Sequence, residues 1–185
     1  MKVIEFAFDS RDTGSANDYL PHNYTQNSVV YTGTHDNETL TGWFRDIRPE
    51  ERRMVRSYLN DFHTSDEEIY WDLVCMAMRS VSKLCVIPMQ DYLGYDNRAR
   101  INQPSTLGKN WKWRLKEGAF SAELIRKIRE MTARYGSAAV YNRRAAGGKC
   151  RKDNAGQHND RAFHTYAHIA PQESLAKMGC ALTGK

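Results

Sequence analysis

Three short, largely apolar runs stand out in the first half of the chain. They cover residues 3–8 (VIEFAF), 28–32 (SVVYT) and 84–88 (LCVIP), and they are rich in β-branched and other apolar residues. A continuous apolar run of this length is typical of a strand that is buried on both faces of a parallel sheet. The pattern therefore predicts three buried strands, running parallel to one another.

Helical patterns alternate with these runs. Pro49 precedes two glutamates, which favours a helix start at that position. The sequence of 65–68 (SDEE) fits a capping box, and apolar residues follow it at helical spacing. A further amphipathic pattern covers 122–135. The segments 10–27 and 94–110 have the Gly, Asn and Pro content of long loops.

Strands that alternate with loops and helices are the pattern of βα units on a parallel sheet. Three strands are too few to close a barrel. By pattern alone, the chain is an α/β protein that is either an open sheet or part of a larger fold. The tail, 136–185, holds six of the twelve glycines and lacks a clear period, so we expect it to be poorly ordered or a poorly packed helix.

A polar group follows each predicted strand. Asp9 ends the first run, His35-Asp36-Asn37 follow the second, and Gln90-Asp91 follow the third. Ligands of parallel α/β folds bind where the carboxyl ends of the strands meet, so these groups are candidates for one site. A His-Asp pair there can hydrogen-bond the hydroxyls of a ligand. Each acidic group has a structural alternative, since an aspartate after a strand often caps a helix.

Aromatic residues give a second signal. Residues 111–114 (WKWR) lie in a predicted loop rather than on a helical face. Rings beside amide and guanidinium groups suit sugars, because the C–H faces of a pyranose pack on a ring while polar groups take its hydroxyls. The alternative is that one or both tryptophans fill the interior of the fold.

Charge and cysteine usage narrow the class of protein. The net charge of +5 comes from the tail: residues 1–135 hold 19 basic and 19 acidic residues, and 136–185 hold 8 and 3. Because few aromatics accompany the basic residues, we expect no nucleic-acid partner. The four cysteines are widely spaced, and we find neither an apolar run of membrane length nor a leader, so we expect a cytoplasmic protein.

A metal site is conceivable only in the tail. His164 and His168 are four residues apart, and Cys150, His158 and Cys180 lie in the same segment. This spacing is loose for metal ligands. We therefore expect no metal and no other cofactor.

The residues that carry a family resemblance lie in six separated motifs: 1–9 (MKVIEFAFD), 20–24 (LPHNY), 30–37 (VYTGTHDN), 88–94 (PMQDYLG), 100–104 (RINQP) and 110–114 (NWKWR). In order and spacing they resemble the end of the amylomaltase, or disproportionating-enzyme, family of 4-α-glucanotransferases. The resemblance covers about 1–135 and does not extend into 136–185.

The resemblance implies a TIM (β/α)₈ barrel, of which this chain would be the last three βα units. It also implies a retaining enzyme that transfers α-1,4-glucan segments between malto-oligosaccharides. Asp36 corresponds to the carboxylate that stabilises the transition state, and His35, Asp9 and Asn102 correspond to substrate contacts. The family's nucleophile and acid/base are on upstream strands, and Met1 matches an internal methionine. We therefore expect a truncated chain that has a missing N-terminal half and is inactive alone.

A different class of function stays open beside this one. A chain that keeps the sugar-binding side of the barrel without the covalent chemistry would be a non-catalytic glucan-binding remnant. Binding to α-1,4-glucans without transfer of glucan segments would distinguish it from an enzyme.

Overall fold

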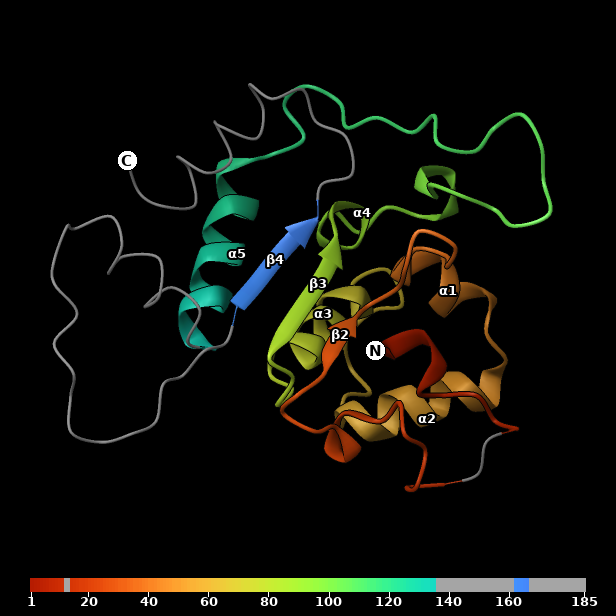
Figure 1. The fold of residues 1–185 in the computed structure, drawn as a ribbon, viewed down its shortest axis with the longest axis vertical. Coiled ribbons are helices and arrows are strands. Elements are labelled where there is room, and N and C mark those ends of the chain that lie inside the picture. Colours follow the sequence, from red (N-terminus) through yellow and green to blue (C-terminus); the bar gives the residue numbers. More distant parts are fainter. Residues whose placement is uncertain (12–13, 136–161, 167–185) are drawn as a thin grey trace, which may run out of the picture.

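The computed structural model describes residues 1–11, 14–135 and 162–166. Four parallel strands form one sheet in the order β1-β2-β3-β4, which is also their order along the chain (Figure 1). They are β1 (Lys2–Val3), β2 (Val29–Tyr31), β3 (Leu84–Pro88) and β4 (Ala162–Tyr166). Because the strands are parallel, the segments that follow β1, β2 and β3 leave the sheet at the same edge. The α/β class and the parallel sheet are as the sequence predicted.

The predicted strands at 28–32 and 84–88 are confirmed, whereas the one at 3–8 is wrong beyond its first residue. β1 pairs with β2 through Val3 and Tyr31, and the chain then turns into the short 3₁₀ helix η1 (Ile4–Phe6). The Ala7 amide donates to the Ile4 carbonyl at 2.9 Å, which closes this turn. An apolar run predicts burial, but burial is equally well achieved by a strand or by a tight turn.

Five α-helices and two further 3₁₀ turns connect the strands in the described residues. They are α1 (Leu40–Asp46), α2 (Pro49–Leu59), α3 (Ile69–Met78), α4 (Met89–Tyr92), α5 (Ala122–Arg134), η2 (Pro21–Asn23) and η3 (Asn97–Ala99). The predicted starts of α2 and α5 are confirmed. The capping box expected at 65–68 is wrong: this segment is a turn, in which the Ser65 carbonyl accepts the Glu68 and Ile69 amides.

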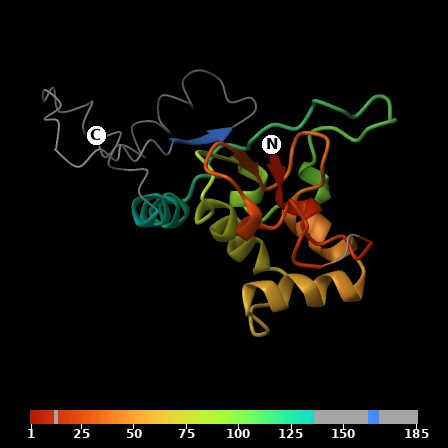
Figure 2. The same cartoon turned by 60° about the horizontal axis from the view of Figure 1, so that its bottom comes forward.

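Figure 2 shows α2 and α3 on the same side of the strands, with the loop that follows η3 passing the opposite side. No helix of the described residues is both long and apolar enough to cross a membrane. In the tail, which we expected to be poorly ordered or a poorly packed helix, residues 162–166 pair with β3 as β4. The other tail residues, 136–161 and 167–185, lie outside the described residues.

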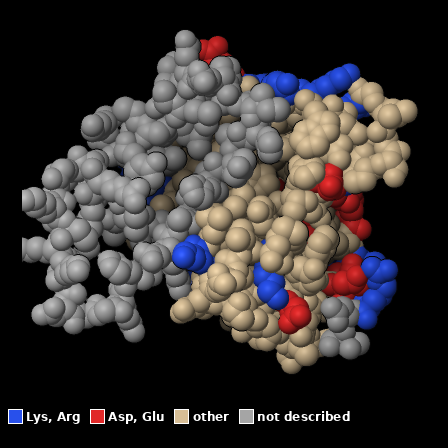
Figure 3. All heavy atoms as spheres, in the orientation of Figure 1, with Lys and Arg blue, Asp and Glu red and all other residues tan. Residues whose placement is uncertain are grey.

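Charged side chains are distributed over the surface. On the face drawn in Figure 3, acidic and basic groups lie among uncharged residues, and no single-sign patch covers the part in view. This arrangement agrees with the equal numbers of basic and acidic residues in 1–135.

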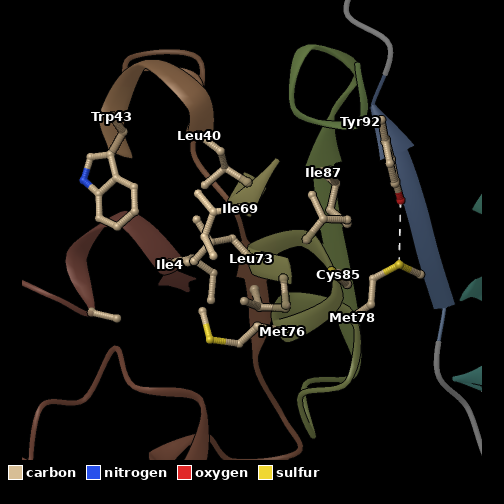
Figure 4. Close-up of a cluster of buried hydrophobic side chains, with 14 of the residues drawn as sticks. Ile4, Leu40, Trp43, Ile69, Leu73, Met76, Met78, Cys85, Ile87 and Tyr92 are labelled. Atoms are coloured by element: carbon tan, nitrogen blue, oxygen red, sulfur yellow. Dashed lines mark hydrogen bonds between the residues drawn. The ribbon is translucent and has the colours of Figure 1, made fainter. Parts of the chain in front are cut away.

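The core lies between the sheet and the helices α1 and α3. Ile69, Leu73 and Met76 of α3 point toward Ile4 and Leu40, and each is at most 1% exposed (Figure 4). Further along, the Tyr92 hydroxyl contacts the Met78 sulfur at 3.8 Å (Figure 4). The residues after β1, the start of α1 and one face of α3 are therefore fixed against each other.

Replacing Leu73 by alanine should remove a fully buried side chain from this core. We expect the free energy of unfolding to fall by about 2–5 kcal/mol, since the lost burial and the cavity both cost stability. Urea denaturation followed by circular dichroism measures it. Leu107→Ala is the matched control, because Leu107 is 99% exposed and its loss should change stability by less than about 0.5 kcal/mol. Equal effects of the two variants would contradict the core assignment.

Candidate active site

The segment Gly33–Asn37, which follows β2, forms a compact turn; we refer to it as the 33–37 turn. The side-chain carbonyl of Asn37 accepts the Thr34 amide at 3.0 Å and the Thr34 hydroxyl at 2.6 Å. The Asn37 amide in turn donates to the Thr34 carbonyl at 3.2 Å. These bonds close the turn on itself and leave His35 and Asp36 at its outer side, each about half exposed.

His35, Asp36 and Asn102 lie together, although 66 positions separate Asp36 from Asn102. Asn102 Nδ2 donates to Asp36 Oδ1 at 2.5 Å, and His35 Nε2 lies 3.3 Å from Asp36 Oδ2. Each carboxylate oxygen thus has one partner and retains acceptor capacity. With 49% of its side chain exposed, Asp36 can accept hydrogen bonds from a ligand.

Arg100 ties the loop of Asn102 to the 33–37 turn. Its Nη2 donates to the Asp36 carbonyl at 2.7 Å and its Nε to the Asn102 carbonyl at 3.0 Å. The Asn102 amide also donates to the His35 carbonyl at 3.2 Å. We predicted no role for Arg100 from the sequence. Its position two residues before the predicted site residue Asn102 was the one indication that it could belong to the site.

Trp111 is the aromatic residue that reaches this group. Its ring lies 5.2 Å from the His35 ring, measured between centroids, and it is 45% exposed. Trp111 has a positive φ of 65°, and its amide donates to the Ile101 carbonyl at 2.8 Å. Trp113 instead packs edge-on against Tyr95. The predicted aromatic loop therefore supplies one ring beside the His-Asp pair.

Asp9 occupies a different environment from the other predicted site residues. Arg11 Nη2 lies 2.6 Å from Asp9 Oδ2, and Arg48 Nη2 lies 4.0 Å from its other oxygen. Hydrogen bonds from Arg11 hold the pKa of the Asp9 carboxyl well below its usual range. An adjacent hollow of about 400 Å³ is lined by Arg11, Glu38, Trp43, Asp46, Ile47, Arg48 and Glu51. One of these lining residues, Glu38, is the residue that directly follows the 33–37 turn in the sequence.

Comparison with known proteins gives this site a context. A model of the 4-alpha-glucanotransferase family matches residues 1–120. The chain belongs to the 4-alpha-glucanotransferase family. It is 46% identical over 138 residues to the 4-alpha-glucanotransferase of Clostridium butyricum and 43% identical over 136 residues to that of Thermus thermophilus. These alignments cover 74% and 71% of this chain but 27% of each relative.

A solved structure of the same family has a similar fold. It is the amylomaltase from Streptococcus agalactiae in complex with acarbose, with a TM-score of 0.66 and 33% sequence identity, and the match covers 72% of this chain and 26% of that one. The chain therefore spans about a quarter of the length of the glucanotransferases it matches. The family inferred from the six motifs is confirmed.

Asp91 of this glucanotransferase chain is a structural group, as the capping alternative allowed. It is 1% exposed, and its two oxygens accept the Thr32 hydroxyl at 2.5 Å and the Leu40 amide at 2.9 Å. Leu40 begins α1, so Asp91 satisfies one of the free amides of that helix start. Its neighbour Gln90 is also buried and donates to the Ala99 carbonyl at 3.2 Å. The two polar residues after β3 are therefore buried and bind neighbouring parts of the chain, and neither is exposed for a ligand.

Metal binding has no support in the part of the chain that the structure describes, where no group of three or more His, Cys, Asp or Glu could hold an ion. The loose tail arrangement with Cys150, His158, His168 and Cys180 lies outside the described residues, as does the side chain of His164.

Burial raises the pKa of Asp91 from 3.8 to about 6, and the bonds from Thr32 and Leu40 offset only part of that rise. Since the folded pKa is above the unfolded one, this contribution to stability is fully present below about pH 4 and is lost as the pH rises through about 6. The change corresponds to at most about 3 kcal/mol of unfolding free energy.

In Asp91→Asn, unfolding free energy should fall much less between pH 4.5 and 7.5 than in the wild type. The amide keeps both contacts, because its oxygen can accept the Leu40 amide while its NH₂ donates to Thr32. Urea denaturation at the two pH values measures the slope, with exposed Asp18→Asn as the matched control. A slope in Asp91→Asn as steep as in the wild type would contradict the assignment.

Proposed function

We propose that this chain forms the last three βα units of a (β/α)₈ barrel in a retaining enzyme that transfers α-1,4-glucan segments between malto-oligosaccharides. The observation that carries the proposal is the Asp36 carboxylate, which is oriented by His35 and Asn102 and remains half exposed. The similarity to an amylomaltase crystallised with acarbose supports the substrate class.

The role we assign to Asp36 is to stabilise the transition state. In glycosyl transfer with retention, positive charge develops on a flattened sugar ring, and hydrogen bonds to its hydroxyls strengthen as it does so. A carboxylate accepts such bonds about twice as strongly as a neutral group. Asn102 and His35 hold the carboxylate in one orientation beforehand, so little reorganisation is required when the charge appears.

The remaining contacts bind and orient the sugar. The Trp111 ring beside His35 offers an apolar surface to the C–H face of a pyranose. We assign Asp9 to a second subsite; its ion pairs with Arg11 and Arg48 and the nearby hollow that Trp43 lines support this assignment. Asn102 can turn its amide between Asp36 and a hydroxyl group.

The covalent chemistry is assigned to strands outside this chain. Retention requires a nucleophile and an acid/base about 5–5.5 Å apart across the scissile bond, and in the family these groups are on earlier strands. The chain aligns with about a quarter of the length of each of the Clostridium butyricum and Thermus thermophilus relatives, which leaves most of the barrel, including the earlier strands, outside the alignment. The 185-residue chain alone is then inactive and needs an N-terminal half to complete the barrel.

The same coverage favours one alternative, a non-catalytic glucan-binding remnant. Acarbose titration by calorimetry and glucose release from maltotriose distinguish the two functions when applied to the chain alone and to a full-length barrel that contains it. The remnant binds acarbose in both forms and releases glucose in neither. The enzyme part releases glucose only in the full-length barrel.

In that full-length barrel, Asp36→Asn should lower kcat roughly a hundredfold, which corresponds to about 3 kcal/mol of lost transition-state stabilisation. The affinity for malto-oligosaccharides, measured by calorimetry, should change far less, because an interaction made mainly in the transition state contributes little to ground-state binding. Glucose release from maltotriose measures kcat, and Asp18→Asn is the control. Turnover near that of the wild type would remove Asp36 from the catalytic set.

A further inference from the structure

Glu5 is a buried carboxyl group directly behind the 33–37 turn. It is the one charged residue of the apolar run 3–8, it lies in η1, and it is 7% exposed. Its amide donates to the carbonyl of Thr32, the residue before the turn, at 3.4 Å. One of its carboxyl oxygens, Oε1, is buried and has no hydrogen-bond partner within the described protein. A buried polar atom of this kind is costly and calls for an explanation.

The carboxyl group of Glu5 lies against the backbone of Gly33. A Cβ atom added at Gly33 would lie 2.5 Å from Glu5 Oε1, well inside van der Waals contact. An alanine here would force the Glu5 carboxyl group to shift, and its Cβ would also lie 3.2 Å from Asn37 Cβ and 3.3 Å from the Glu38 carbonyl oxygen. The residue that opens the turn and the side chain behind it are fitted to one another.

The other contact of Glu5 is with the residue that closes the turn. The Asn37 side chain lowers the pKa of the Glu5 carboxyl group and so favours the carboxylate, and the oxygen of that same amide accepts the Thr34 amide and hydroxyl. Glu5 thus contacts both ends of the turn, Gly33 and Asn37. The turn holds His35 and Asp36 between these ends.

The charges around Glu5 oppose its ionisation. Burial is the largest cause of a raised Glu5 pKa, followed by the Asp91 carboxyl, while Glu38 also raises it and Asn37 and Arg100 lower it. Asp91 belongs to α4, and Arg100 is the residue that holds the Asp36 carbonyl from the other side. His35 and Asp36 are the titratable groups of the turn itself.

We propose that Glu5 is a positioning residue: its buried carboxyl group, seated between Gly33 and Asn37, holds the 33–37 turn in the conformation that directs Asp36 toward a sugar. The proposal rests on the proposed function only for the role of Asp36. The neutral carboxylic acid is the form that fits this place, since it adds no charge beside Asp91. Ionisation would place a second carboxylate beneath the turn.

Amide resonances of the 185-residue chain test this directly. In a pH titration followed by ¹⁵N NMR, the Gly33 and Asn37 amides should show an inflection well above the usual glutamate range of about 4.3. This inflection should be lost in Glu5→Gln and move to lower pH in Asp91→Asn, where a repelling charge is removed. His35 and Asp36 are ionisable side chains of the same turn, so only the inflection lost in Glu5→Gln is assigned to Glu5. Its persistence in Glu5→Gln would overturn the proposal.

A double-mutant cycle tests the contact with Gly33. Gly33→Ala should destabilise the wild-type chain more than it destabilises Glu5→Ala, because the added Cβ meets Glu5 Oε1 only in the former. Urea denaturation of the four proteins measures the coupling. Strictly additive effects would contradict the proposal. Glu130→Gln on α5, which changes an exposed carboxylate, should leave the effect of Gly33→Ala unchanged.

Acarbose affinity, measured by calorimetry on the same chain, tests the consequence for the ligand. Glu5→Gln, which keeps the shape of the neutral acid, should bind within about twofold of the wild type, while Glu5→Ala should bind at least about fivefold more weakly. Wild-type affinity in Glu5→Ala, with unchanged turn amides, would overturn the positioning role. If the full-length barrel releases no glucose from maltotriose, the proposed function fails, while the amide titration of the chain still decides the role of Glu5.

Discussion

The buried carboxyl group of Asp91 is the interaction on which the arrangement of the site depends. It joins three parts of the chain: Asp91 lies in α4 after β3, Thr32 directly follows β2, and Leu40 begins α1. The 33–37 turn lies between the last two of these anchor points. The Asp91 carboxyl group is held firmly by its two donors, because breaking either bond would leave a buried polar group without a hydrogen-bond partner. The position of the turn thus follows from a bond made behind it.

Three carboxyl groups near the turn show how environment divides one chemical group among different roles. Asp36 is half exposed and partnered by an amide and an imidazole, so it is open to a ligand. Asp91 is enclosed and serves as a helix cap. Glu5 is enclosed against a glycine, and one of its carboxyl oxygens has no hydrogen-bond partner among the residues that the structure describes. Burial raises the pKa of the two enclosed groups, which favours their neutral forms.

Three of the residues around His35 and Asp36 belong to the loop after η3 and not to the segments that directly follow the strands. Arg100, Asn102 and Trp111 reach the turn from the segment after η3, and Arg100 binds backbone carbonyls on both sides of the contact. A loop positioned by a rigid scaffold is a common location for binding residues. The chain that carries this arrangement belongs to the 4-alpha-glucanotransferase family and spans about a quarter of the length of the relatives it matches.

The sequence by itself determined the buried segments, the parallel sheet, the family and the residues at the strand ends. Apolar runs and motif order report burial and ancestry, and both are local properties of the chain. It could not determine that the run at 3–8 turns after Val3, because a strand and a 3₁₀ turn bury the same residues. Only the tertiary structure decided that Asp36 meets Asn102, that Asp9 pairs with Arg11 and Arg48, and that Glu5 lies against Gly33. These contacts depend on side-chain direction and distance between remote segments, and spacing along a chain does not encode either of them.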